Sequence, residues 1–207
     1  MQKFLDYIQK QYSPLTVIIY GSYADGTHNL NSDFDALVIT AHHDIFHDIS
    51  FVEGVQLDLF VYPVSYFNEA VDYDEFIQIF DGTIVIDTDG LGSHLKEQVL
   101  EYIDQIPSKS EDEIRKSVAW CDKMLARVKR RDIEGMFRWH WVLTDSLTIF
   151  CDTVRRPYFG PKKTLKWMEK DYPAEFTAYQ TALFDFTETS LHNWISCLKK
   201  LLEKRID

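Results

Sequence analysis

Two aspartates stand two residues apart at the opening of an apolar, β-branched segment. Asp33 and Asp35 occur in "SDFDALVIT", whose other residues are typical of a buried strand. Because side chains alternate across a strand, both carboxylates would share one face, about 6 to 7 Å apart along the chain. A carboxylate in such a segment is costly unless a cation meets it. Mg²⁺ prefers carboxylate oxygens, so the pair predicts a site for one or two hard divalent cations.

A third carboxylate and a Gly-Ser pair extend this pattern. Asp58 lies between two leucines in a later apolar segment, and it would supply a third ligand if the two strands are neighbours. Gly21 and Ser22 directly follow the apolar run 15–20. There, a glycine lets backbone amides approach a phosphate, and a serine adds a hydroxyl donor. Together these residues predict a metal ion that carries a nucleotide.

The elements that must position these residues are strands in the first half of the chain. Apolar spacing predicts an amphipathic helix at residues 2–12 and mixed helical spacing at 64–80. Short β-branched runs bounded by polar, Gly or Pro residues predict strands at residues 15–20, 32–40, 55–62 and 83–88. The first half is therefore expected to form a mixed β-sheet flanked by helices.

From residue 93 onward the apolar periodicity is helical. Ser110 and Glu113 have capping-box spacing, which predicts a helix that starts near residue 110. Two further long helices are predicted at residues 135–154 and 174–204. The expected fold class is α+β, with a catalytic domain in residues 1–105 and a bundle of three to five helices in residues 106–207.

The segment "GSYADGTHNLNSDFD" resembles the signature of the polymerase-β-like nucleotidyltransferase superfamily. That signature is Gly-Ser after a strand, about ten residues, then Asp-x-Asp, with a third carboxylate on a later strand. The signature itself is matched by Gly21, Ser22, Asp33 and Asp35. Gly26 and Ser32 match residues that often accompany it, and Asp58 matches the third carboxylate. The layout, with a helical part after the motif, is similar to that of aminoglycoside- and lincosamide-modifying nucleotidyltransferases.

The resemblance implies transfer of a nucleoside monophosphate from an NTP, with ATP preferred, to a hydroxyl group, with release of pyrophosphate. It implies that Asp33, Asp35 and Asp58 are catalytic residues that bind two Mg²⁺ ions, while Gly21 and Ser22, together with Ser32, contact the nucleotide. The acceptor is expected to be a small hydroxylated molecule, of a class that includes antibiotic-like compounds. Two alternatives stay open: a protein-AMPylating, antitoxin-like enzyme, and a non-catalytic nucleotide-sensing or interaction protein that retains the fold.

Charge is distributed unevenly along the chain, whose net charge is −11. Residues 11–95 contain 14 Asp and Glu residues and neither Lys nor Arg. A cation for the triphosphate must therefore come from the helical part or from another subunit. The resemblance favours Lys162 and Lys163, which lie in the basic segment 155–168. The pattern also allows a homodimer in which a neighbouring helical domain supplies these cations.

Composition excludes several other classes of function. Nucleic acid is not an expected partner because its binding depends on cations that neutralise phosphates. No apolar segment approaches the length of a membrane span, so a cytoplasmic protein without membrane contact is expected. The three cysteines lack CxxC spacing and predict neither a disulfide framework nor a zinc site. The histidines of residues 42–48 are interpreted as a polar surface connection, and no motif selects Glu134 or Asp145 as a general base.

Overall fold

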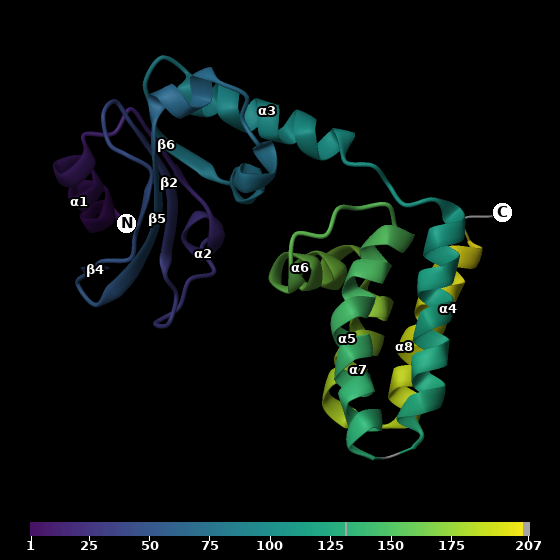
Figure 1. Ribbon diagram of the computed structural model, residues 1–207. Helices are drawn as coiled ribbons and strands as arrows, with labels where there is room; N and C mark the ends of the chain where they lie inside the picture. The colour runs from purple at the N-terminus through teal and green to yellow at the C-terminus, as the bar shows by residue number, and fades with distance from the viewer. Residues whose placement is uncertain (131, 205–207) are drawn as a thin grey trace. The chain divides into compact units, whose positions relative to one another are not determined.

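The computed structural model describes residues 1–130 and 132–204, and the chain divides into two compact units, Met1–Ile106 and Pro107–Asp207. The first unit holds a mixed β-sheet with helices, and the second is helical (Figure 1). The predicted α+β fold class is confirmed. None of the described helices has the length and apolar character needed to cross a bilayer.

Six strands make up the sheet of the first unit. They are β1 (Thr16–Ile19), β2 (Phe34–Thr40), β3 (Phe46–Asp48), β4 (Phe51–Val52), β5 (Val55–Pro63) and β6 (Thr83–Asp87). The strand order is β3-β5-β2-β1-β6, and β4 pairs with β5 beside this path. The pairing of β2 with β5 is parallel, whereas the pairings of β1 with β2, β1 with β6 and β3 with β5 are antiparallel. The first unit therefore has a mixed sheet.

Helix α1 (Gln2–Tyr12) covers one face of this sheet. Phe4, Ile8 and Tyr12 recur at four-residue spacing and are buried against alternate residues of β1, β2 and β5, such as Val17 and Ala36. Helix α3 (Leu91–Gln105) lies against the other face (Figure 1), to which Thr16 and Ile18 belong because they alternate with Val17 and Ile19. Its residue Gly92 approaches so closely that a Cβ there would lie 2.7 Å from Cγ2 of Thr16.

Three short helices complete the first unit, and each follows a strand or lies between strands. Helix α2 (Gly21–Ala24) follows β1, whereas two 3₁₀ helices, η1 (Val64–Asn68) and η2 (Tyr73–Ile79), lie between β5 and β6. The two 3₁₀ helices account for the mixed helical spacing of residues 64–80, because a 3₁₀ helix repeats every three residues.

Five helices form the described part of the second unit. They are α4 (Glu111–Val128), α5 (Ile133–Thr153), α6 (Pro161–Asp171), α7 (Pro173–Asp185) and α8 (Glu188–Glu203). The predicted capping box is present, since Ser110 caps α4 and exchanges hydrogen bonds with Glu113.

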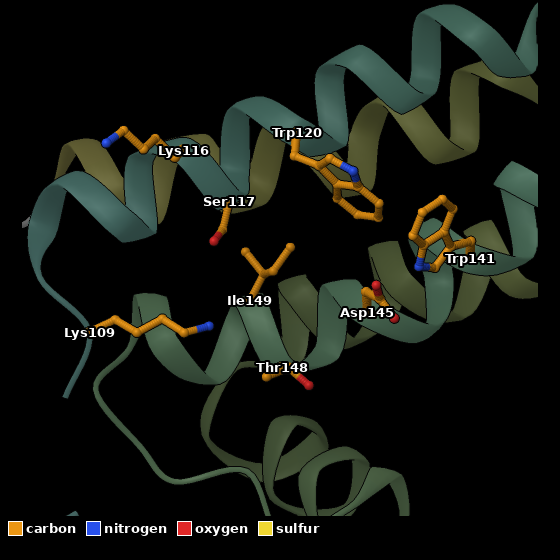
Figure 2. A pocket seen from close by; sticks show the side chains of 8 residues that line it. All are labelled: Lys109, Lys116, Ser117, Trp120, Trp141, Asp145, Thr148 and Ile149. Carbon is orange, nitrogen blue, oxygen red and sulfur yellow. The ribbon is translucent and has the colours of Figure 1, made fainter. Parts of the chain in front are cut away.

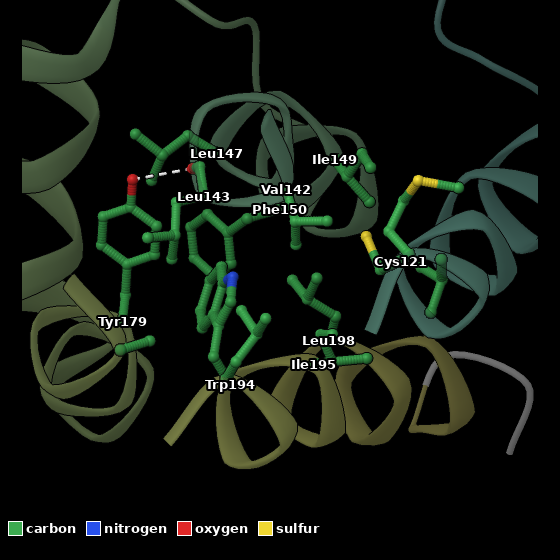
Figure 3. Packing of buried hydrophobic residues seen from close by; sticks show 14 of the residues in the cluster. Cys121, Val142, Leu143, Leu147, Ile149, Phe150, Tyr179, Trp194, Ile195 and Leu198 are labelled. Atoms are coloured by element: carbon green, nitrogen blue, oxygen red, sulfur yellow. Dashed lines mark hydrogen bonds between the residues drawn. The ribbon is translucent and has the colours of Figure 1, made fainter. Parts of the chain in front are cut away.

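The core of the second unit is apolar, and two of its buried aromatic side chains donate hydrogen bonds to α5. The Tyr179 hydroxyl donates to the carbonyl oxygen of Leu143 at 2.8 Å, which joins α7 to α5 (Figure 3). The Trp194 indole N–H donates to Oγ of Ser146, also at 2.8 Å, which joins α8 to α5. Because both donors are buried and satisfied, these aromatic residues fill the core without the cost of an unpaired polar group.

Two predictions about secondary structure are wrong. The helix predicted at residues 174–204 is two helices, because Phe186 adopts a left-handed backbone conformation with φ of 49° and Thr187 caps the start of α8. The polar connection predicted at residues 42–48 contains strand β3, which is too short and too polar to show a strand pattern. In addition, the strand predicted at 32–40 begins at Phe34, so Asp33 lies just ahead of it.

Candidate active site

Two of the three predicted carboxylates lie side by side on neighbouring strands. In the parallel pairing of β2 with β5, Asp35 is the direct partner of Asp58. Partners in register point to the same face of a sheet, and this face is opposite to the one that α1 covers. Their neighbours Phe34 and Leu57 point to the α1 face and are fully buried. The strand alternation therefore separates an apolar core face from a face that carries a carboxylate pair.

A glycine makes room for one of these carboxylates. Gly21 has a φ of +66°, and a Cβ added there would lie 2.3 Å from Oδ2 of Asp35. The backbone N–H of Tyr20, the preceding residue, donates to the carbonyl oxygen of Asp35 at 3.1 Å. The turn that leaves β1 is thus packed directly on the Asp35 side chain. Only glycine combines this left-handed conformation with this close approach.

A buried tyrosine lies beside the carboxylate pair. Tyr20 is 7% exposed, and its pKa is raised by burial first and then by the negative charges of Asp58 and Asp35. The neutral hydroxyl is therefore the stable form at this position. The same charge effect shows that both carboxylates act on one small region at the end of β1.

The loop between α2 and β2 is held by its own short polar side chains. Oδ1 of Asp25 accepts hydrogen bonds from Thr27, and Oδ1 of Asn29 accepts one from the N–H of Asn31. Ser32 Oγ accepts from the N–H of Asn29 at 2.9 Å. Such local bonds to the backbone are typical of Asx turns. Ser32 therefore shapes the loop that leads to Asp33, and its predicted contact with the nucleotide stays a prediction.

Ser22 lies at the start of α2, next to Gly21. It is only 6% exposed, and no described residue forms a hydrogen bond with its hydroxyl group. A ligand that reaches the end of β1 would therefore find an available donor at Ser22.

A histidine that the sequence did not select also belongs to this region. His47 lies on β3, and its Nε2 atom is in hydrogen-bond contact with Oδ1 of Asp58. Its ring stacks on Phe60, with centroids 4.4 Å apart and planes at 7°. The stack and the contact together fix the orientation of the Asp58 carboxylate. Only the pairing of β3 with β5 places His47 here, because 10 residues separate it from Asp58 in the chain.

The residues present fit a divalent cation in part. Asp35 and Asp58 supply adjacent carboxylate oxygens, which are the donors that Mg²⁺ prefers. Asp33 is exposed and lies outside β2. Across residues 1–130 and 132–204, no three His, Cys, Asp or Glu side chains already have the arrangement of a metal site. The donor chemistry suits Mg²⁺, while substrate phosphates and water would have to supply the remaining ligands.

The cations predicted for the triphosphate lie in the second unit. Lys162 and Lys163 occupy the first turn of α6, directly after Pro161. Positive charges at this end of a helix interact unfavourably with its dipole. In the first unit, Lys96 donates to the carbonyl oxygen of Gly82 at 2.6 Å and is occupied there. The assignment of Lys162 and Lys163 to the nucleotide stays a prediction.

Comparison with known proteins agrees with the motif. The family model described as "Nucleotidyltransferase domain" matches residues 1–88, which include Gly21, Ser22 and the three aspartates. A nucleotidyltransferase-like protein from Exiguobacterium sibiricum 255-15 is similar over 99% of this chain and 73% of its own, with 14% identity and a TM-score of 0.36. That likeness is too low to carry an argument. No curated protein matches the chain. The resemblance inferred from the motif is confirmed by the family match, which assigns residues 1–88 to a nucleotidyltransferase domain.

Proposed function

We propose that the protein transfers a nucleoside monophosphate from an NTP, with ATP preferred, to a hydroxyl group of a small molecule and releases pyrophosphate. The observation that carries this proposal is the register of Asp35 with Asp58 beneath the glycine turn at Gly21. Phosphoryl-type transfer needs little covalent chemistry from a protein, because positioning and neutralisation of charge supply most of the rate enhancement. A small set of fixed polar groups is enough for this task.

Each group of the site has a place in this scheme. Asp35 and Asp58, with Asp33 from the adjoining loop, would hold Mg²⁺. When bound, Mg²⁺ would neutralise charge on the phosphates and lower the pKa of a coordinated oxygen. Ser22 and the backbone amides after Gly21 would bind the terminal phosphates. His47 is a positioning residue, because its contact with Asp58 holds that carboxylate in one orientation.

The transfer reaction is tested by mass spectrometry. Pooled aminoglycosides, lincosamides and other small alcohols are incubated with the protein, Mg²⁺ and each NTP, and both the acceptors and the protein are then analysed for adducts. We expect a nucleoside monophosphate adduct on a small molecule together with pyrophosphate. Asp35→Asn should lower its rate of formation by about 100-fold, since it removes a charged ligand.

A matched variant separates the site from the general effect of charge. Asp104→Asn removes one negative charge from an exposed position on α3 and should leave the rate unchanged. If the adduct forms only on the protein itself, the proposed small-molecule acceptor is wrong and the acceptor is a protein. If Mg-NTP binds but neither adduct nor pyrophosphate forms, the catalytic proposal is wrong and nucleotide sensing replaces it.

The role of the two lysines needs a separate measurement. Lys162→Gln and Lys163→Gln should raise KM for the NTP and leave the expression and fold of the protein intact, because both residues lie at the start of α6 rather than in the core. Lys170→Gln, at the last turn of the same helix, is the control. An unchanged KM in both variants would remove these residues from the nucleotide site.

A further inference from the structure

The helical unit contains a pocket that the nucleotidyltransferase motif does not involve. It lies between α4 and α5 and has a volume of about 520 Å³ (Figure 2). Pockets for small molecules typically have volumes of about 300 to 1,000 Å³. Its side chains come from successive turns of the two helices and from Lys109, just ahead of α4, so the pocket belongs to the second unit alone.

One end of the pocket is aromatic. Trp120 of α4 and Trp141 of α5 meet edge to face there, with ring centroids 5.3 Å apart and planes at 72°. Trp141 is 40% exposed, whereas Trp139 and Trp194 in the core of the same unit are 2% and 0% exposed. A large aromatic side chain in contact with water lacks much of the favourable free energy that burial would provide. The aromatic end is therefore a surface that a ligand could cover with a gain in free energy.

A carboxylate lies beside these indoles. Asp145 follows Trp141 by one helical turn and faces the same pocket (Figure 2). It is half-buried, and it has no ion pair or hydrogen bond with any residue in the described part of the chain. A carboxylate without a cation, next to the electron-rich faces of two indoles, gives this end of the pocket a negative potential.

The other end of the pocket carries positive charge that is already compensated. Lys109 pairs with Asp152 at 2.7 Å, and Lys116 pairs with Asp112 one turn earlier on α4. In Figure 2 both lysines lie toward the opposite end of the pocket from Trp141. Among the side chains that line the pocket the acidic one is Asp145, so a second cationic group of a ligand would find no further carboxylate there. The pocket therefore distinguishes a singly charged amine from a polycation.

We propose that this pocket binds a small organic cation with one ammonium group and an apolar body. The ammonium group contacts the indole faces of Trp120 and Trp141 and the carboxylate of Asp145, while the body fills the space toward Ile149. The proposal is independent of the nucleotide chemistry of the first unit, because every residue that it uses belongs to the second unit.

The test compares two probes with the same body in the full-length protein. 2-Phenylethylamine carries an ammonium group at pH 7, and 2-phenylethanol carries a neutral hydroxyl group in its place. Binding is followed by calorimetry and by the NMR signals of the indole N–H groups. We expect the amine to bind at least tenfold more tightly than the alcohol and to shift the signals of Trp120 and Trp141, but not that of the buried Trp194.

Variants assign the binding to named groups. Asp145→Asn should weaken the binding of the amine about tenfold and leave that of the alcohol unchanged. Asp185→Asn, an equal change of charge at the exposed end of α7, should have no effect. Trp141→Leu removes a side chain that is already partly exposed and should weaken both probes, while the far-UV circular dichroism stays that of the wild type.

Three results would overturn the proposal. These are equal affinity for the amine and the alcohol, full affinity of Asp145→Asn for the amine, and a triamine such as spermidine binding more tightly than 2-phenylethylamine. None of these results bears on nucleotide transfer, which is measured by adduct formation. Failure of one proposal is therefore distinguishable from failure of the other.

Discussion

Replacing Gly21 with alanine tests how the site is built. Its Cβ would lie 2.3 Å from Oδ2 and 3.0 Å from Cγ of Asp35, so the carboxylate must move. Gly26 is the matched control, because it has a similar φ of +74° and no atom within 4 Å of an added Cβ. Both substitutions carry the cost of a left-handed conformation, about 1 to 2 kcal/mol. Only Gly21→Ala adds the cost of overpacking, about 1 to 3 kcal/mol.

Hydrogen exchange of β1 and β2 measures this difference in the first unit. The five tryptophans all lie in the second unit, so their fluorescence checks that the helical bundle is unchanged. We expect exchange of the strands to show Gly21→Ala as the less stable variant by about 1 to 3 kcal/mol. Its binding of Mg-NTP should also be lost, whereas Gly26→Ala should retain binding.

A double-mutant cycle identifies the contact responsible. Asp35→Ala removes the carboxylate that the new Cβ would meet, so Gly21→Ala should cost less in that background, by a coupling energy of about 1 to 3 kcal/mol. Two results would contradict this role of Gly21: equal stability of the two glycine variants, or a coupling energy close to zero. In either case the turn at Gly21 would not be what positions Asp35.

Three further predictions concern pH and local stability. Asp48 accepts a hydrogen bond from the Tyr12 hydroxyl, so Asp48→Ala should lower the free energy of unfolding by about 1 to 3 kcal/mol, measured by exchange of β3 and β5. Burial by itself raises the pKa of Asp48. Hydrogen bonds from Ser50 and then from Tyr12 have the larger combined effect, and they lower the pKa of Asp48 below 3.8. The stabilisation is thus complete above pH 3.8 and is lost as the pH falls through the lower folded value, and its persistence in full at lower pH would contradict this account. The raised pKa of Tyr20 acts in the opposite direction, because the contribution of Tyr20 to folding stability is complete below pH 10.0 and is lost as the pH rises above that value. Tyr20→Phe should therefore reduce the loss of stability at alkaline pH, measured by urea unfolding. Ser110→Ala should cost about 1 kcal/mol in thermal unfolding of the helical unit because it removes the cap of α4, and an unchanged midpoint would show that the cap contributes nothing.

Local patterns in the sequence were sufficient for most of the elements. The helix predicted at residues 2–12 matches α1, and the strands predicted at 15–20 and 55–62 correspond to β1 and β5. These segments have regular apolar spacing and clear ends, so short-range information decides their structure. The break between α7 and α8 was missed because Phe186 is neither Gly nor Pro, and its left-handed conformation gives no signal in the sequence.

The candidate site was also predictable from the sequence only in part. Gly21, Ser22 and the aspartates were selected as candidates from residue type and spacing, because a phosphate turn and carboxylate ligands need these side chains wherever they occur. The contact of His47 with Asp58 was missed because it depends on β3, an edge strand of three residues. Edge strands are held by pairing with a neighbour rather than by their own apolar pattern.

The sequence by itself determined the class of chemistry, since the Gly-Ser turn and the spaced aspartates carry it in their identity and order. The tertiary structure decided which groups share one place. Parallel pairing of β2 with β5 sets Asp35 beside Asp58, and the packing of α4 on α5 sets Trp120 beside Trp141 and Asp145. Strand register and helix packing depend on contacts between residues far apart in the chain. Spacing along a single sequence does not encode such contacts.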